Sequence, residues 1–289
     1  MPYRIPKRII QTGRHVTQPL LSRAMMMNIR LLNPDYDFLF FDDQGVEAFF
    51  DQEFPQYRAV FESFRFSIQR YDFFRYLAVY RYGGFYFDLD VLLASDLSDL
   101  LSFGCVFPFE GLTLSHHLRH DHGIDWEIGN YAFGAAPGHP FLKAVIDNCV
   151  KAQQDPGWIQ PMMRGSVGLL RAEYLILNST GPGLVSRTLA ESPDLAKTVT
   201  VLFPEDVCDV RNWNRFGELG IHFMDGSWRV KSSFLRRRLA QYLESWKLRR
   251  LLKQSLKLGR QRYHVGNGDA MVEGHLSVTG QVPLQEPTA

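Results

Sequence analysis

Residues 67–90 have the sequence SIQRYDFFRYLAVYRYGGFYFDLD, which predicts a helix, a turn and a buried strand in succession. Apolar side chains recur through residues 67–82 at the spacing of an amphipathic helix, and we expect Ser67 to be its N-cap. Gly83-Gly84 ends the helix, because glycine readily adopts the left-handed conformation found after a helix C-terminus. The apolar run at 85–87 then predicts a short buried strand that leads into two aspartates.

Strands and helices alternate on both sides of this stretch. Strands are expected at residues 8–13, 36–41, 85–87 and 199–203, and helices at residues 20–32, 44–50, 67–82, 140–153, 167–177 and 181–191. Such alternation is typical of an α/β sandwich with a mostly parallel central sheet. Because ligands in such folds bind beyond the carboxyl ends of the strands, Asp88 and Asp90 are expected at the mouth of a site.

Composition limits the class of protein further. The chain has 289 residues, 45% of them apolar, which excludes a wholly disordered chain. Its three cysteines are far apart, so neither a disulfide framework nor a thiolate zinc site is expected. There is no apolar run of membrane-spanning length and no signal-peptide pattern at the N-terminus. We therefore expect a cytoplasmic protein.

The two aspartates have a spacing that suits a metal ion. In extended chain, Asp88 and Asp90 point to the same face, and paired carboxylates can bind Mg²⁺ or Mn²⁺ while leaving room for substrate phosphates. Asp72 and Arg75 are three residues apart and share a face of the preceding helix. Arg75 could contact a phosphate or a sugar hydroxyl, and Asp72 a ribose or sugar hydroxyl.

Several short motifs occur in one order along residues 5–228 and together resemble glycosyltransferase family 32. That family includes α-mannosyl- and α-galactosyltransferases and is similar to the glucosylating clostridial toxins. The motifs are residues 5–12, 70–77, 82–90, 129–133, 137–141 and 180–183, and His222 with Gly226-Ser227-Trp228.

The resemblance implies a fold, a donor and a metal. The fold is the GT-A type, a Rossmann-like αβα sandwich with a mostly parallel sheet, to which C-terminal helices are added here. The donor is a UDP- or GDP-linked hexose, and the metal is commonly Mn²⁺, or else Mg²⁺. The reaction transfers the hexose, with retention of configuration, to a glycan or glycolipid hydroxyl. We expect a role in the synthesis of polysaccharide or lipid-linked oligosaccharide.

The resemblance also assigns roles to individual residues. The metal ligands are Asp88, Asp90 and His222, with Asp90 as the principal one. The catalytic set is Asp72, Arg75, Asp88, Asp90 and Asn130. Contacts to the donor are expected from Gln11, Thr12, Asp72, Arg75, Asp88, Ser227 and Trp228. Gly13 stands where the family commonly has Trp, which leaves open what stacks on the base.

Two other functions are compatible with the same residues. The run from Phe85 to Val91 also fits the nucleophile loop of a haloacid-dehalogenase-like phosphohydrolase, with Asp88 as nucleophile and Asp90 as general acid. That loop normally opens its domain, whereas about 85 residues precede it here. The second alternative is a catalytically inactive module that binds a glycan or a nucleotide.

A histidine-rich segment at residues 112–126 has no assigned role. His117 and His120 would suit a zinc site if they lay on a helix. Gly123 and the polar context favour a loop that faces the acceptor or the solvent, so the role of the cluster from His116 to His122 stays open.

The charge of the chain is divided unevenly. Residues 229–262 contain 12 Lys+Arg and one acid, a balance of +11, so the rest has 20 basic and 30 acidic residues, a balance of −10. Leu, Tyr and Trp residues in the basic segment fall on one helical face, which is typical of a helix that binds an anionic membrane surface. We predict a catalytic domain at 1–228, a basic amphipathic helical segment at 229–262 and a disordered tail at 263–289. Nucleic acid is not an expected partner; the protein is expected peripherally on the cytoplasmic face of the membrane.

Overall fold

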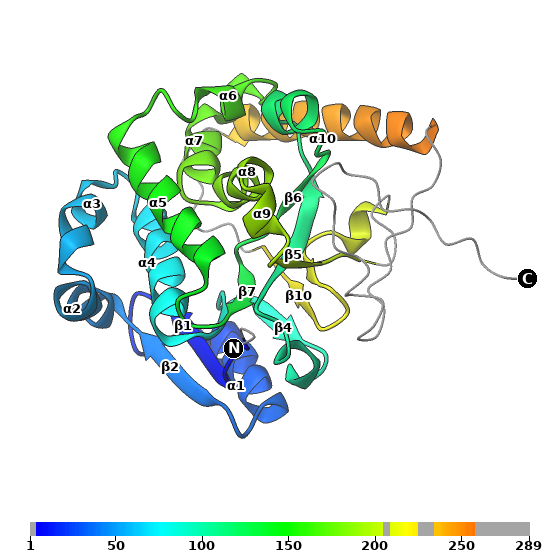
Figure 1. Cartoon of the computed structure of the whole chain (residues 1–289). Coiled ribbons are helices and arrows are strands. Elements are labelled where there is room, and N and C mark those ends of the chain that lie inside the picture. Colours follow the sequence, from blue (N-terminus) through cyan, green and yellow to red (C-terminus); the bar gives the residue numbers. More distant parts are fainter. Residues whose placement is uncertain (1–3, 205–208, 225–233, 258–289) are drawn as a thin grey trace, which may run out of the picture.

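The computed structural model describes residues 4–204, 209–224 and 234–257 (Figure 1). The strands are β1 Arg8–Thr12, β2 Asp37–Phe41, β3 Gly84–Phe87, β4 Val91–Leu93, β5 Cys105–Leu112, β6 Trp126–Ile128, β7 Ala132–Ala135, β8 Thr200–Leu202, β9 Arg215–Phe216 and β10 Gly220–His222. The α-helices are α1 Leu20–Leu32, α2 Asp43–Glu53, α3 Arg58–Ser63, α4 Ser67–Tyr82, α5 Pro140–Gln154, α6 Gln160–Met163, α7 Arg171–Ser179, α8 Pro182–Glu191, α9 Pro193–Ala196 and α10 Phe234–Lys257. Single turns of other helix types are η1 Pro55–Tyr57, η2 Ser98–Leu100, η3 His117–Asp121, η4 Gly168–Leu170 and η5 Val210–Asn212.

The central sheet has seven strands in the order β2-β1-β3-β7-β5-β6, with β8 paired to β5. β1 is parallel to β2 and β3, and β5 is parallel to β8. β7 is antiparallel to both β3 and β5, and β6 is antiparallel to β5. Five strands, namely β1, β2, β3, β5 and β8, therefore run in one direction, and the predicted α/β class with a mostly parallel sheet is confirmed.

Each face of the sheet packs against its own apolar core. Successive strand residues point to opposite faces, so Ile10 and Tyr86 belong to one cluster and Ile9, Phe85 and Phe87 to the other. The first cluster is covered by helices α4, α5 and α8, which lie together in Figure 1. The second face is covered by α1 and by a small second sheet, in the order β4-β10-β9.

Local sequence signals placed several elements well. The predicted helices at 20–32 and 67–82 match α1 and α4 in both bounds. The prediction of Ser67 as N-cap is wrong, because Ser67 is already the first helical residue and Phe66 is the cap. The Phe66 backbone N–H donates to Oε1 of Gln69 at 3.1 Å, so a side chain of the first turn binds the backbone of the cap residue, whereas a capping hydroxyl would accept from an N–H of that turn.

The C-terminal part of the chain is described only in part. Residues Phe234–Lys257 of the predicted basic segment form α10, which confirms that this part is helical. Among the described residues no helix is both long and apolar enough to cross a bilayer. Ser227, Trp228 and the predicted tail at 263–289 lie outside the described residues.

The close approach of β3 to β1 depends on Gly84. Its φ is +106°, and a Cβ there would lie 2.5 Å from the carbonyl oxygen of Arg8. We predict that Gly84→Ala lowers the free energy of unfolding in urea by about 2 kcal/mol or more, because the backbone is strained and the strands are forced apart. Gly168→Ala is the matched control, since a Cβ there meets nothing within 4 Å. Equal stability of the two variants would contradict this account of the strand pairing.

Candidate active site

The carboxyl ends of β1 and β3 lie side by side. Ile10 pairs with Tyr86, so Thr12 and Asp88 each come two residues later at the same edge of the sheet. The antiparallel neighbour β7 begins at this edge, and the backbone N–H of Asp88 donates to the carbonyl of Tyr131 at 2.7 Å. The predicted position of the two aspartates at the mouth of the sheet is thereby observed.

Arg75 is the centre of a buried charge network. Its side chain is 4% exposed, and its guanidinium lies 3.1 Å from Oδ1 of Asp88 and 3.4 Å from Oδ1 of Asp72. It also donates to the carbonyl of Asn130 at 2.8 Å and lies over the ring of Tyr86, 4.6 Å from the centroid. A charge this deeply buried needs such partners, so Arg75 joins α4 to the DxD segment and to the segment before β7.

Asp72 is held from three sides. Its Oδ1 accepts from Nδ2 of Asn130 at 3.1 Å, and its Oδ2 accepts from Oγ1 of Thr180 at 2.9 Å. Burial raises the pKa of Asp72 to about 6, while the charge of Arg75 and these two hydrogen bonds oppose the rise. The Asn130 amide also donates to the hydroxyl of Tyr76 at 2.8 Å. Asp72 and Arg75 from one predicted motif and Asn130 from another are therefore in direct contact.

The second aspartate, Asp90, contacts a histidine more than 130 residues further along the chain. β10 pairs with β4 so that His222 is opposite Val91, and its Nε2 lies 3.3 Å from Oδ1 of Asp90. The ring of His222 stacks on that of Tyr131 with centroids 4.2 Å apart. Burial alone would lower the pKa of His222, but the hydrogen bond to Asp90 and the charges of Asp90, Asp88 and Glu110 together outweigh burial, so the pKa is raised.

Three of these side chains converge in a way that suits a cation. One donor atom each from Asp88, Asp90 and His222 lies within 4.8 Å of the other two. Burial raises the pKa of Asp88, with Asp90 adding to the rise and Arg75 opposing it. Nδ1 of His222 is buried and has no hydrogen-bond partner among the described residues. Two carboxylates and one imidazole fit a divalent metal such as Mn²⁺ in donor type.

The predicted nucleotide-pocket residues lie at the end of β1. Thr12 is buried and its hydroxyl donates to the carbonyl of Phe41 at 2.8 Å. Gln11 is also buried, and its Nε2 has no hydrogen-bond partner among the described residues. The predicted phosphate contacts of Ser227 and Trp228 lie outside the part of the chain that the structure describes.

Sequence reasoning missed three polar side chains of this site. The hydroxyl of Tyr86 donates to Oδ1 of Asp88 at 2.8 Å, and alternation along β3 could have predicted that both point to one face. Thr180, in the quoted motif at 180–183, had no assigned role. Glu110 follows an apolar run on β5. Burial raises the pKa of Glu110; the charge of His222 opposes this rise and the charge of Asp88 adds to it. No local pattern connects Glu110 with residues so far along the chain.

We predict that Arg75→Met lowers the free energy of unfolding by about 3–5 kcal/mol, because it leaves two carboxylates in a buried site without their cation. Arg81→Met is the matched control on the same helix. Arg81 is half exposed and pairs with Glu53 at 2.5 Å, so its loss is expected to cost no more than about 1 kcal/mol. Urea unfolding monitored by circular dichroism measures both. A similar loss of unfolding free energy in Arg75→Met and Arg81→Met would contradict the claim that the buried guanidinium of Arg75 stabilises the site more than an exposed ion pair does.

Comparison with known families supports the motif analysis. The family described as "Glycosyltransferase sugar-binding region containing DXD motif" matches residues 22–106. This region contains α4, β3, Asp88 and Asp90. It favours a glycosyltransferase over the phosphohydrolase alternative.

Curated relatives match over part of their length. Inositol phosphoceramide mannosyltransferase 3 of Schizosaccharomyces pombe is 31% identical over 144 residues, which are 50% of this chain and 37% of the relative. Mannosyl phosphorylinositol ceramide synthase SUR1 of Saccharomyces cerevisiae is 28% identical over 185 residues, which are 64% of this chain and 42% of the relative. The chain therefore matches less than half the length of either relative.

Among solved structures, the PaToxG glycosyltransferase aligns with a TM-score of 0.49 at 15% identity, covering 96% of this chain and 88% of that chain. The family match includes the helix, turn and strand from which the resemblance was inferred. Residues 22–106 of the chain thus match the sugar-binding region, with its DXD motif, of this glycosyltransferase family.

Proposed function

We propose that the protein is a metal-dependent, retaining glycosyltransferase of the GT-A type. It moves a hexose from a UDP- or GDP-linked donor to a hydroxyl of a glycan or glycolipid. The observation that carries the proposal is the convergence of Asp88, Asp90 and His222, whose donor atoms lie within 4.8 Å of one another. The two aspartates belong to the DXD region, and His222 comes from the C-terminal part of the proposed catalytic domain at 1–228.

The metal is proposed to be Mn²⁺ or Mg²⁺, held by Asp88, Asp90 and His222. When bound, such an ion neutralises the negative charge that grows on the leaving diphosphate. The carboxylates supply the hard oxygen ligands that these ions prefer. Ser227 and Trp228 are proposed to close over the phosphates and exclude water, which favours transfer over hydrolysis.

The remaining site residues are proposed to position these groups and bind the donor. Arg75 and Asp72 are almost completely buried, and each bonds to several protein groups, which favours a positioning role over direct contact with the sugar. Arg75 orients the Asp88 carboxylate from one side and Tyr86 from the other. Nε2 of Gln11, which has no hydrogen-bond partner among the described residues, is proposed to contact the nucleotide, with Thr12 beside it. Asn130 is proposed at the border of donor sugar and acceptor.

The names of the relatives narrow the donor and the acceptor. Both describe the mannosylation of an inositol-containing phosphoceramide. We therefore propose mannose as the transferred hexose and a glycolipid as the acceptor, in preference to a polysaccharide. Because the chain matches less than half the length of each relative, the preference for mannose and for a glycolipid acceptor is tested directly.

A donor screen tests the proposal. Thermal shift is measured with UDP- and GDP-linked hexoses, GDP-mannose among them, with and without Mn²⁺. We predict that one donor raises Tm only in the presence of the metal, because the diphosphate and the carboxylates share the ion. A response to no donor, together with phosphatase turnover, would overturn the proposal in favour of a phosphohydrolase. A response without any transfer or hydrolysis would indicate the inactive binding module.

Asp90→Ala is expected to lower metal-dependent turnover of the identified donor by more than about 100-fold, since it removes a direct ligand. Asp99→Ala is the matched control, because Asp99 is an exposed aspartate nine residues further along the chain. Turnover is measured as release of the nucleoside diphosphate. Retained turnover in Asp90→Ala would remove this residue from the proposed metal site.

We further propose that the segment at 229–262 holds the protein peripherally on an anionic membrane, on the cytoplasmic face. One side of α10 packs on the body of the protein: Ala240 is buried, Glu244 accepts from the hydroxyl of Tyr174 at 2.6 Å, and Lys247 donates to the carbonyl of Gly165 at 2.7 Å. The helix therefore has a fixed orientation, which decides what its other side presents.

The other side of α10 has apolar and aromatic side chains in water. Leu239, Tyr242 and Trp246 are 53%, 68% and 51% exposed. Basic residues flank them in sequence and give the whole segment a balance of +11. Exposed aromatic rings beside a dense positive charge suit the headgroup region of an anionic bilayer.

Vesicle flotation tests this second proposal. We predict that the wild type floats with anionic vesicles but not with neutral ones, that salt weakens the binding, and that Tyr242→Ser with Trp246→Ser reduces it. The matched control replaces Leu20 and Leu31, two exposed leucines of α1, at the opposite end of the molecule (Figure 1). Equal loss in both double variants, or equal flotation of all proteins, would contradict a membrane-binding face on α10.

A further inference from the structure

The histidine-rich segment between β5 and β6 contains a tight helical turn that sequence periodicity did not predict. Residues His117–Asp121 form a single π-helical turn, in which residues five apart come together. His117 and His122 have this spacing, and their rings pack edge to face with centroids 4.7 Å apart. Gly123 follows with a φ of +69°, which turns the chain back toward β6. The ordinary helical pair His117 and His120 is therefore not the pair that converges.

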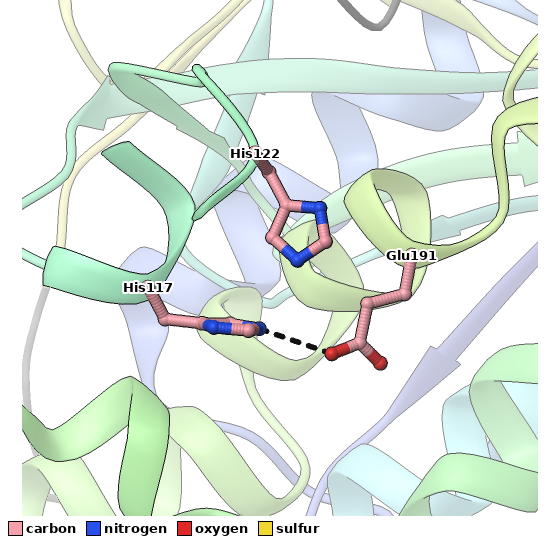
Figure 2. Close-up of side chains that lie close together, drawn as sticks. All are labelled: His117, His122 and Glu191. Carbon is pink, nitrogen blue, oxygen red and sulfur yellow. Dashed lines mark hydrogen bonds and ion pairs between the residues drawn. The ribbon is translucent and has the colours of Figure 1, made fainter. Parts of the chain in front are cut away.

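A carboxylate from another element completes the group. Glu191 is the last residue of α8, and its Oε1 lies 3.0 Å from Nε2 of His117. Figure 2 shows the two imidazole rings and the Glu191 carboxylate turned toward one another. One donor atom from each of the three lies within 4.8 Å of the other two. None of these residues belongs to the candidate active site.

The surroundings hold two of these side chains in position. Nδ1 of His117 lies 2.8 Å from Oδ2 of Asp121, and in the tautomer that donates there, Nε2 offers its lone pair to a metal ion between His117 and Glu191. This carboxylate–histidine pairing is the one that orients imidazole ligands in zinc proteins. On the other side, Nε of Arg187 donates to Oε1 of Glu191 at 2.7 Å. The carboxylate keeps its second oxygen for another partner.

We propose that His117, His122 and Glu191 form a second metal site, for Zn²⁺ or a similar transition-metal ion. Two imidazoles and one carboxylate are ligands that Zn²⁺ accepts, with water in the fourth position. Ligand bonds of about 2.0–2.1 Å place the donor atoms of a tetrahedral site about 3.3 Å apart. Small rotations of the side chains achieve this from the observed separations. Binding requires neutral imidazoles, because the lone pair of a ring nitrogen is the ligand.

The ion would clamp the β5–β6 connection to the C-terminal end of α8. That connection has Glu110 on the strand before it and Asn130 shortly after it, and both lie near the candidate active site. The clamp is thus a structural element that fixes the segment on the active-site border. The inference does not depend on the proposed transferase activity.

Metal binding by the untagged chain of 289 residues tests the proposal. Every protein carries Asp90→Ala, which disables the other candidate metal site. The chelator-treated protein is titrated with Co²⁺, whose visible absorption reports tetrahedral coordination, and then with Zn²⁺ by equilibrium dialysis. We expect one tetrahedral Co²⁺ per chain, displaced by Zn²⁺, and a rise in Tm with Zn²⁺.

His122→Ala and, separately, Glu191→Gln are expected to abolish the absorption band and the Tm rise. His120→Ala is the matched control, since this exposed histidine lies on the same loop, stacks on His116 and is not part of the cluster. Circular dichroism verifies that each variant is folded. If His122→Ala is not folded, His122→Asn is measured in its place. Binding that survives in His122→Ala, or no tetrahedral band in the parent protein, would overturn the site and leave His117 as the partner of two carboxylates.

Discussion

The ion pair between Arg75 and Asp88 is the contact on which the candidate active site depends. A guanidinium that is almost wholly buried cannot be left without an anion, because the desolvation of an unpaired charge costs several kcal/mol. It therefore fixes the distance between α4, which carries Arg75, and the segment that follows β3. The same guanidinium binds the carbonyl of Asn130, so three separate segments share one anchor.

The positions of Asp90 and His222 depend on this anchored Asp88. With Asp88 fixed by Arg75 and Tyr86, the next two residues lead into β4, whose pairing with β10 places His222 against Asp90. The small second sheet thus connects the DxD segment to the C-terminal part of the chain. The two carboxylates point to one place because a strand end, a buried cation and a strand pairing each restrict them.

Local sequence patterns predicted several helices and strands, whereas the partners of the site side chains depend on contacts between residues far apart in the sequence. The bounds of α1 and α4 could be predicted from apolar spacing, and the end of α4 also from the paired glycines after Tyr82. The position of Asp88 and Asp90 followed from the rule for strand ends. The Ser67 cap was wrong because Ser67 is already the first helical residue, and the cap residue Phe66 donates its N–H to the side chain of Gln69. Partners such as Thr180 for Asp72, 108 residues apart, and Glu191 for His117 could not be found by any periodicity.

The central claim is that Asp88, Asp90 and His222 form one metal site. Electron paramagnetic resonance of free Mn²⁺ measures it most directly, because bound ions leave the free-ion signal. His222→Ala is predicted to weaken Mn²⁺ binding by about 10-fold or more, whereas His15→Ala, which replaces an exposed histidine near β1, leaves it unchanged. An unchanged affinity in His222→Ala would contradict the claim and leave the two aspartates without the histidine that the fold brings to them.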